Sequence, residues 1–152
     1  VIEQIKQQKF DFVICSSLLH EVINPDKLLS DIKNVCQKDT ILHINVPNSM
    51  SFHLLWAYES GLISHLGNLT PTAKTLQQHN TFTIESLKKQ VENIGFKVKD
   101  SGSYFIKPFN HNKMADMIEQ NLIDDNLLNG LYNMSKYLPE LGSDIYVNCE
   151  LQ

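Results

Sequence analysis

The chain has 152 residues, of which 42% are hydrophobic and 20% charged, with a formal net charge of −4; these values are typical of one globular domain and exclude a disordered chain. All 13 basic residues are lysines, so the arginine forks that clamp phosphate and guanine are missing and nucleic-acid binding is not expected. The three cysteines form no CxxC pair and the six histidines have no HxH or HxxxH spacing, so we expect neither a metal site nor a disulfide framework. No apolar run approaches about 18 residues, so we expect no membrane span.

The first third of the sequence predicts a strand, a helix and a second strand. Residues 12–15 form a short apolar run that suits a strand covered on both faces. Asn24 is a good N-cap and Pro25 fits the first helical position, so we expect a helix to begin there. The apolar residues that share one face of this helix are Leu28, Leu29, Ile32, Val35 and Cys36. A strand over 41–46 follows and stops at Pro47.

The middle of the chain predicts a helix over 49–66 and then a mobile loop over 67–80. Thr83 is the expected N-cap of another helix, and Gly95 supplies its left-handed C-terminal cap. A third strand follows over 96–106. Gly102 within it suggests a bulge or bend.

Residues 107–142 predict a helical insertion, in which Asn112 and Asp124 are the expected N-caps of two helices. A final strand over 143–151 shows apolar and polar residues in alternation. Strands that alternate with helices indicate an α/β fold with a largely parallel sheet.

Four segments in this order resemble the second half of a class I S-adenosylmethionine-dependent methyltransferase. They are FDFVICSSLLHEVINPDKLLSDI (10–32), ILHINVPNSMS (41–51), HNTFTIESLKKQVENIGFKV (79–98), and the IKPF and LPELGS motifs of the insertion. The resemblance implies one partial methyltransferase domain over 1–152. Its Rossmann-like sheet would carry the family's fourth to seventh strands, the last of them antiparallel, with the helical insertion before that last strand.

The family's cofactor site begins with a glycine-rich turn and continues with an acidic residue, and this sequence matches neither. None of the six glycines forms a GxG pair. We therefore expect residue 1 to lie near the middle of the family's domain, so that the chain lacks the N-terminal cofactor half and is inactive alone. The strand over 12–15 would then be an apolar sheet edge, and such edges invite pairing with another chain. We expect self-association through that strand or through the face left by the missing half.

The resemblance also implies site residues. Ser16, Ser17 and Leu19 would border S-adenosylmethionine, while His20 and Glu21 stand where the family has an EH pair, in swapped order. A histidine at this place can accept a proton from a hydroxyl or amine. The alternative is that both residues only lead into the helix that begins at Pro25.

The expected substrate-binding residues are Asn45, Asn48, His53 and Tyr58. Asn48 is equally consistent with a simple turn after Pro47. His53 and Tyr58 belong, with Trp56, to a stretch that forms an acceptor lid in the related subgroup, and the alternative is a surface helix that packs its aromatic side chains on the sheet. Lys107, before Pro108, is either a surface lysine or a contact of the acceptor, and we expect it at the surface.

The sequence thus predicts methyl transfer from S-adenosylmethionine to a hydroxyl or amine of a small molecule, such as a sugar. One alternative is a non-catalytic association module derived from a methyltransferase half-domain. Another is the second half of a nicotinamide-dependent reductase, because Tyr132 and Lys136 have Tyr-x-x-x-Lys spacing, but they lie too late in the chain. The polar segment 1–9 lacks the apolar core of a signal peptide, so we expect a cytoplasmic protein.

Overall fold

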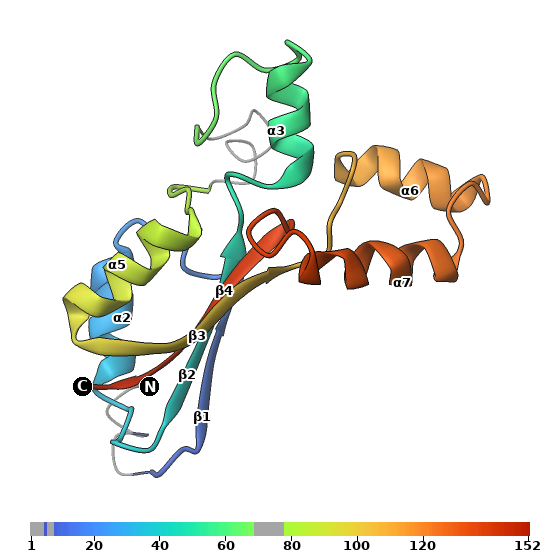
Figure 1. Cartoon of the computed structure of the whole chain (residues 1–152). Coiled ribbons are helices and arrows are strands. Elements are labelled where there is room, and N and C mark those ends of the chain that lie inside the picture. Colours follow the sequence, from blue (N-terminus) through green and yellow to red (C-terminus); the bar gives the residue numbers. More distant parts are fainter. Residues whose placement is uncertain (1–4, 6–7, 69–77) are drawn as a thin grey trace.

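The computed structural model of the chain describes residue 5 and residues 8–68 and 78–152. Four strands within them form one sheet in the order β1-β2-β4-β3 (Figure 1). The strands are β1 (Phe12–Ser16), β2 (Ile41–Pro47), β3 (Phe96–Tyr104) and β4 (Asp144–Leu151). β1 is parallel to β2, and β4 is antiparallel to both β2 and β3. The predicted partial α/β sheet with an antiparallel last strand is confirmed; most of the loop predicted over 67–80 lies outside the described residues.

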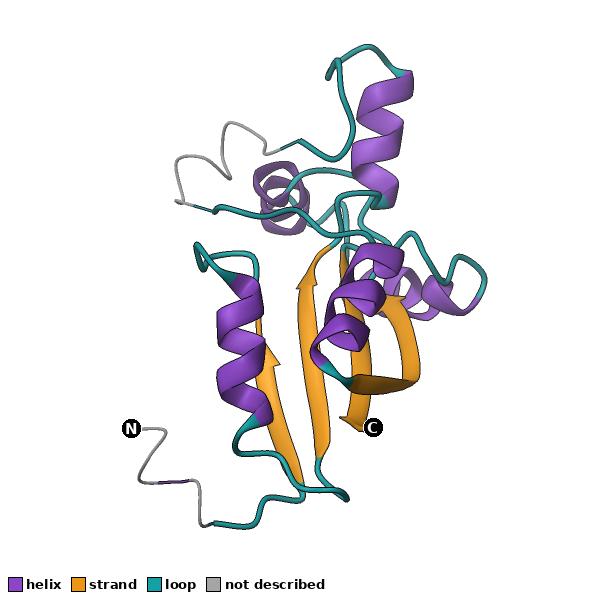
Figure 2. Cartoon of the chain, turned by 90° about the vertical axis from the view of Figure 1, so that its left-hand side faces the viewer, coloured by secondary structure: helices purple, strands orange, loops and turns teal. Residues whose placement is uncertain are grey.

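Two helices cover one face of the sheet and form the core with it. They are α2 (Pro25–Lys33) and α5 (Ile84–Ile94), and Figure 2 shows both on the same side of the strands. Leu29, Leu87 and Val91 from these helices are fully buried against the inward side chains of β2 and β4. Each such side chain contributes about 1.5–3 kcal/mol by leaving water.

The ends of α2 and α5 agree with the predicted caps. The Asn24 side chain accepts a hydrogen bond from the backbone of Lys27 at 2.9 Å. Thr83 and Ser86 form a reciprocal capping box, and Gly95 ends α5 with a left-handed φ of 98°. α2 stops at Lys33, so the predicted helical residues 35–36 lie beyond its end, although both are buried.

Two predictions for the middle of the chain are wrong. The helix predicted over 49–66 is shorter, α3 (Phe52–Glu59), and Gly61 just beyond it takes a left-handed φ of 70° that an α-helix does not contain. The irregularity in β3 lies between Val98 and Asp100 rather than at Gly102. Gly102 instead gives room to the ring of Tyr146, whose hydroxyl would be 3.1 Å from an added β-carbon.

The segment before β4 contains α6 (His111–Glu119), α7 (Asp125–Asn133) and a short 3₁₀ helix, η1 (Met134–Lys136). Figure 1 shows α6 and α7 away from α2 and α5, beyond the end of β3 and the start of β4. Asp124 caps α7 as predicted. Asn112 is not the cap of α6, because the Asn110 side chain reaches the backbone N–H of Lys113 and starts the helix two residues earlier.

The face of the sheet opposite α2 and α5 carries aromatic and apolar side chains. The rings of His43, Tyr146 and Tyr104 follow one another across three strands, with centroid distances of 5.9 and 6.4 Å. On β1, Phe12 and Ile14 are 68% and 69% exposed. β1 lies at the edge of the described sheet, as expected for this strand. No helix among the described residues is long and apolar enough to cross a bilayer.

Candidate functional site

A hollow of about 270 Å³ lies where β1 and β2 end, and we call it the rim pocket. The carboxyl ends of parallel strands are where open α/β sheets bind ligands. Its polar walls come from separate parts of the chain: His20 after β1, Asn48 after β2, His53 in α3, Lys107 after β3 and Asp144 at the start of β4. The topology therefore brings together four ionisable side chains from four separate parts of the chain.

His20 is the most unusual polar side chain in the rim pocket. It is only 4% exposed, and its Nδ1 has no hydrogen-bond partner among the described residues. Its Nε2 lies 3.9 Å from Glu21 Oε1, too far for a hydrogen bond. Burial lowers the pKa of His20, against the opposing effect of the Glu21 and Asp144 carboxylates. The imidazole is therefore neutral at neutral pH, and a buried atom of this kind is costly unless a ligand pairs with it.

His53 and Lys107 bring two further groups whose charged forms are disfavoured. Burial, assisted by the nearby Lys107 ammonium, lowers the pKa of His53 to about 4. The ring is oriented by a hydrogen bond of 3.0 Å between its Nδ1 and the hydroxyl of Ser51. Burial also lowers the pKa of Lys107, while Asp144 acts in the opposite direction. Lys107 was expected at the surface, and it lines the rim pocket instead.

The residues expected to border the cofactor divide into two groups. Ser16 and Ser17 are exposed at the end of β1, and Ser17 has a left-handed φ of 48°, which is uncommon for a residue with a side chain and recurs at functional sites. Leu19 is fully buried in the hydrophobic core. Its side chain therefore presents no surface to a cofactor in this structure, and its expected place beside the cofactor stays a prediction.

Asn48 was expected to bind substrate, but both of its N–H donors are already used. Its Nδ2 donates to the carbonyls of Glu140 and Gly142 at 2.8 and 2.9 Å, and its Oδ1 accepts from the backbone of Met50 at 2.9 Å. A carboxamide has two N–H donors, so no donor remains for a substrate. The side chain instead holds the turn before β4 against the end of β2.

The other expected residues lie outside the rim pocket. Asn45 is buried on the opposite face of the sheet, next to Ser17, with Nδ2 at 3.4 Å from the serine hydroxyl. Glu21 has a half-exposed side chain, and Tyr58 is 41% exposed. Neither lines the pocket; of the expected site residues, the structure brings His20, Asn48 and His53 together there.

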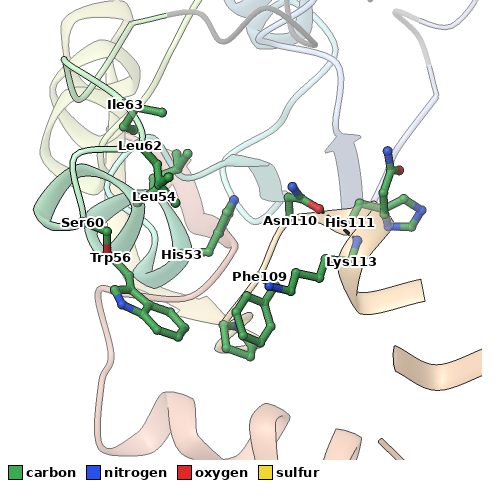
Figure 3. A pocket seen from close by; sticks show the side chains of 13 residues that line it. His53, Leu54, Trp56, Ser60, Leu62, Ile63, Phe109, Asn110, His111 and Lys113 are labelled. Atoms are coloured by element: carbon green, nitrogen blue, oxygen red, sulfur yellow. Dashed lines mark hydrogen bonds between the residues drawn. The ribbon is translucent and has the colours of Figure 1, made fainter. Parts of the chain in front are cut away.

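A second, larger hollow of about 790 Å³ lies between α3 and residues 108–113, and we call it the aromatic pocket (Figure 3). Trp56 and Phe109 lie together on one side of it, with ring centroids 5.2 Å apart. The ammonium of Lys113 is 4.3 Å from the centroid of Phe109. His53 and Leu54 line both hollows, so the two share a wall.

Sequence reasoning missed Phe109 and Asp144. Nothing in the local pattern marks Phe109, because its aromatic partner Trp56 is more than fifty positions away. Asp144 is simply the first residue of an alternating strand. Its role in the rim pocket comes from the antiparallel pairing that sets it beside Pro47.

Comparisons with known proteins agree with this architecture. A family model described as a methyltransferase domain matches residues 2–101. The solved structure of a SAM-dependent methyltransferase, possibly a histamine N-methyltransferase, from Thermotoga maritima is similar with a TM-score of 0.57 and 15% identity, over 97% of this chain and 59% of that one. A SAM-dependent methyltransferase from Archaeoglobus fulgidus gives 0.51 and 16%, over 98% of this chain and 62% of that one.

A third similar structure, the [4+2]-cyclase SpnF, has a TM-score of 0.52 and 14% identity, over 94% of this chain and 51% of that one. The chain thus spans between about half and three-fifths of the length of these three proteins. No protein of curated function matches the chain. Because one of the similar structures is described as a cyclase, the shared fold does not determine the reaction, which has to be argued from the site.

Proposed function

The chain belongs to the methyltransferase domain family, and we propose that it forms the acceptor side of an S-adenosylmethionine-dependent methyltransferase active site. The acceptor would be a hydroxyl or amine of a small molecule, bound in the rim pocket. The observation that carries this proposal is His20, a buried, neutral imidazole at the carboxyl end of β1 whose Nδ1 has no hydrogen-bond partner within the described part of the chain.

His20 is suited to take a proton from the acceptor. A hydroxyl that attacks a methyl group must lose its proton, and a general base within hydrogen-bond reach contributes typically 10²–10⁴-fold. The pKa of His20 is lowered mainly by burial, which keeps the imidazole in its basic form at neutral pH. Asp144 would stabilise the imidazolium that forms, because its carboxylate acts to raise the same pKa.

The described residues could form only part of a binding site for S-adenosylmethionine. Ser16 and Ser17 are exposed and polar at the end of β1, where they can border the cofactor, whereas the 152 residues contain no GxG turn. The cofactor, when bound, supplies an electrophilic methyl group, and the protein contributes alignment. We propose that these 152 residues alone bind S-adenosylmethionine weakly and need a glycine-rich half, whichever polypeptide carries it, to complete the site.

A non-catalytic association module is the second candidate, and the exposed Phe12 and Ile14 on the edge strand favour it. Calorimetric titration of S-adenosylmethionine into the chain, alone and with a polypeptide that carries the glycine-rich half of a class I methyltransferase, separates the two. Our proposal expects weak binding by the chain alone and much tighter binding in the mixture. Absence of binding in both samples would favour the association module.

The role of His20 is tested by S-adenosylhomocysteine formation in that mixture, with a panel of small hydroxyl and amine acceptors. We expect His20→Gln to lower kcat at least 100-fold and to remove the acidic limb of the pH profile. Tyr137→Ala, which truncates a 73% exposed side chain that lines neither pocket, is the matched control and should retain the wild-type rate. An unchanged rate in His20→Gln would show that this histidine is not the base.

A further inference from the structure

We propose that the aromatic pocket binds the flat, apolar body of the methyl acceptor, and that it prefers a neutral or singly anionic molecule over a cation. This inference rests on the proposed function, because it assigns the second hollow to the same ligand as the rim pocket. It commits to one class of acceptor: a ring system with a nucleophilic hydroxyl or amine at one end and, where it is charged, a carboxylate at the other.

The first argument is that the two hollows are adjacent. His53 and Leu54 line both of them, and we infer that a ligand held in the rim pocket extends past these two side chains into the aromatic pocket. The His53 ring is neutral at neutral pH, and its Nδ1 is held by Ser51. Its Nε2 is then left to pair with a polar group at the middle of the ligand.

The second argument is the size and chemistry of the aromatic pocket. At about 790 Å³ the aromatic pocket is larger than the rim pocket of about 270 Å³, and its volume falls in the range of pockets that hold drug-sized molecules. Trp56 and Phe109 present flat apolar surface, and Leu54 of α3 lines the same pocket with Leu62 and Ile63, which follow that helix (Figure 3). Trp56 is 46% exposed and Leu62 79%, so both have surface that a ligand would remove from water.

The third argument is the charge of the walls. Lys113 lines the aromatic pocket, and no aspartate or glutamate is among its described lining residues. A carboxylate at this end would be attracted by the ammonium, whereas a cation would meet repulsion without a counter-charge. One lysine without an arginine fork suits a single carboxylate better than a phosphate.

Trp56 is the only tryptophan of the chain, so its indole N–H gives one resonance that reports directly on the aromatic pocket. We would titrate the ¹⁵N-labelled chain with 2-naphthoate, 2-naphthol and 2-naphthylmethylamine, which share a ring system and differ in charge. The proposal expects saturable shifts of the indole resonance with the first two, and binding of the amine at least five-fold weaker than that of naphthoate.

Two variants and one control sharpen the test. Ala57→Phe fills the pocket and should weaken naphthoate and naphthol at least ten-fold. Lys113→Gln should remove the advantage of naphthoate over naphthol while naphthol still binds. Tyr137→Ala, an exposed aromatic truncation outside the pocket, should leave all three affinities unchanged.

The proposal is overturned if the indole resonance does not move saturably with naphthoate and naphthol, if Ala57→Phe binds both as the wild type does, or if the amine binds as tightly as naphthoate. These readouts measure binding at Trp56 and need no methyl transfer. Failure of the S-adenosylhomocysteine assay with bound naphthyl alcohols would instead count against the proposed function.

Discussion

Replacement of Gly142 by alanine tests how the turn before β4 is held. A β-carbon at this position would lie 2.5 Å from the backbone nitrogen of Tyr104 and 2.6 Å from its carbonyl oxygen. Comfortable contacts are about 3.5 Å, so the turn or the end of β3 must move by about 1 Å. Both atoms belong to the backbone of a paired strand, which cannot rotate away as a side chain can.

The free-energy cost follows from that displacement. Overpacking alone costs about 1–3 kcal/mol. The movement would also strain the bonds from the Gly142 amide to Ser103 Oγ at 2.8 Å and from Asn48 to the Gly142 carbonyl at 2.9 Å, each worth about 1 kcal/mol. We expect a loss of about 3 kcal/mol, which lowers Tm by about 6–12 °C in a domain of this size.

Gly130→Ala is the matched control, because an added β-carbon there meets no atom within 4 Å and Gly130 lies inside α7. It should stabilise the protein by about 0.5–1 kcal/mol. Thermal unfolding followed by circular dichroism measures both variants. A Gly142→Ala protein that melts within 1 °C of the wild type would refute the proposed packing of this turn.

Three further outcomes are expected. The pKa of His53 is about 4 in the folded protein and 6.5 in the unfolded chain, so the folded protein binds fewer protons and loses stability as the pH falls from 6.5 towards 4. In urea titrations, the free energy of unfolding should fall over this pH range by about 1–2 kcal/mol more in the wild type than in His53→Gln. Equal losses in the two proteins would contradict the assignment. Thr83→Ala removes one half of the α5 capping box and should lower the free energy of unfolding by about 1 kcal/mol, whereas Thr83→Ser should cost less; equal losses in urea titrations would argue against the cap. Ile14→Lys places a charge on the exposed edge strand and should reduce concentration-dependent light scattering; a wild-type chain that stays monomeric over a wide concentration range would rule out association through β1.

Much of the fold could be predicted because its determinants are local. The cap at Asn24, the capping residue Thr83 and the left-handed Gly95 each act within one helical turn, and all three lie where the sequence placed them. The alternation of apolar and polar residues in the last strand likewise matches the alternation of buried and partly exposed side chains along β4. The wrong cap for α6 shows the limit, because Asn110 and Asn112 have the same chemistry and only the path of the chain after Pro108 decides between them.

The site was less predictable, because its properties arise between distant segments. Asn48 has a side chain well suited to bind substrate, yet the turn ninety positions later consumes its donors. Lys107 has the sequence context of a surface lysine, yet it is partly buried in the rim pocket, together with Asp144, which strand pairing sets beside the end of β2. Leu19 follows two exposed serines but turns into the core.

The position of β4 has a consequence for how the protein folds. β4 comes after the other three strands along the chain, yet it lies between β2 and β3 and is the only described strand paired with β3. Until the residues of β4 have left the ribosome, β3 has no partner among the described strands, and the edge of β2 that β4 later covers is unpaired. Joining segments this far apart carries a large loop-closure entropy, which makes completion of the sheet a late and slow event. The nascent chain therefore has a window during synthesis in which chaperones or premature aggregation compete for its apolar strands.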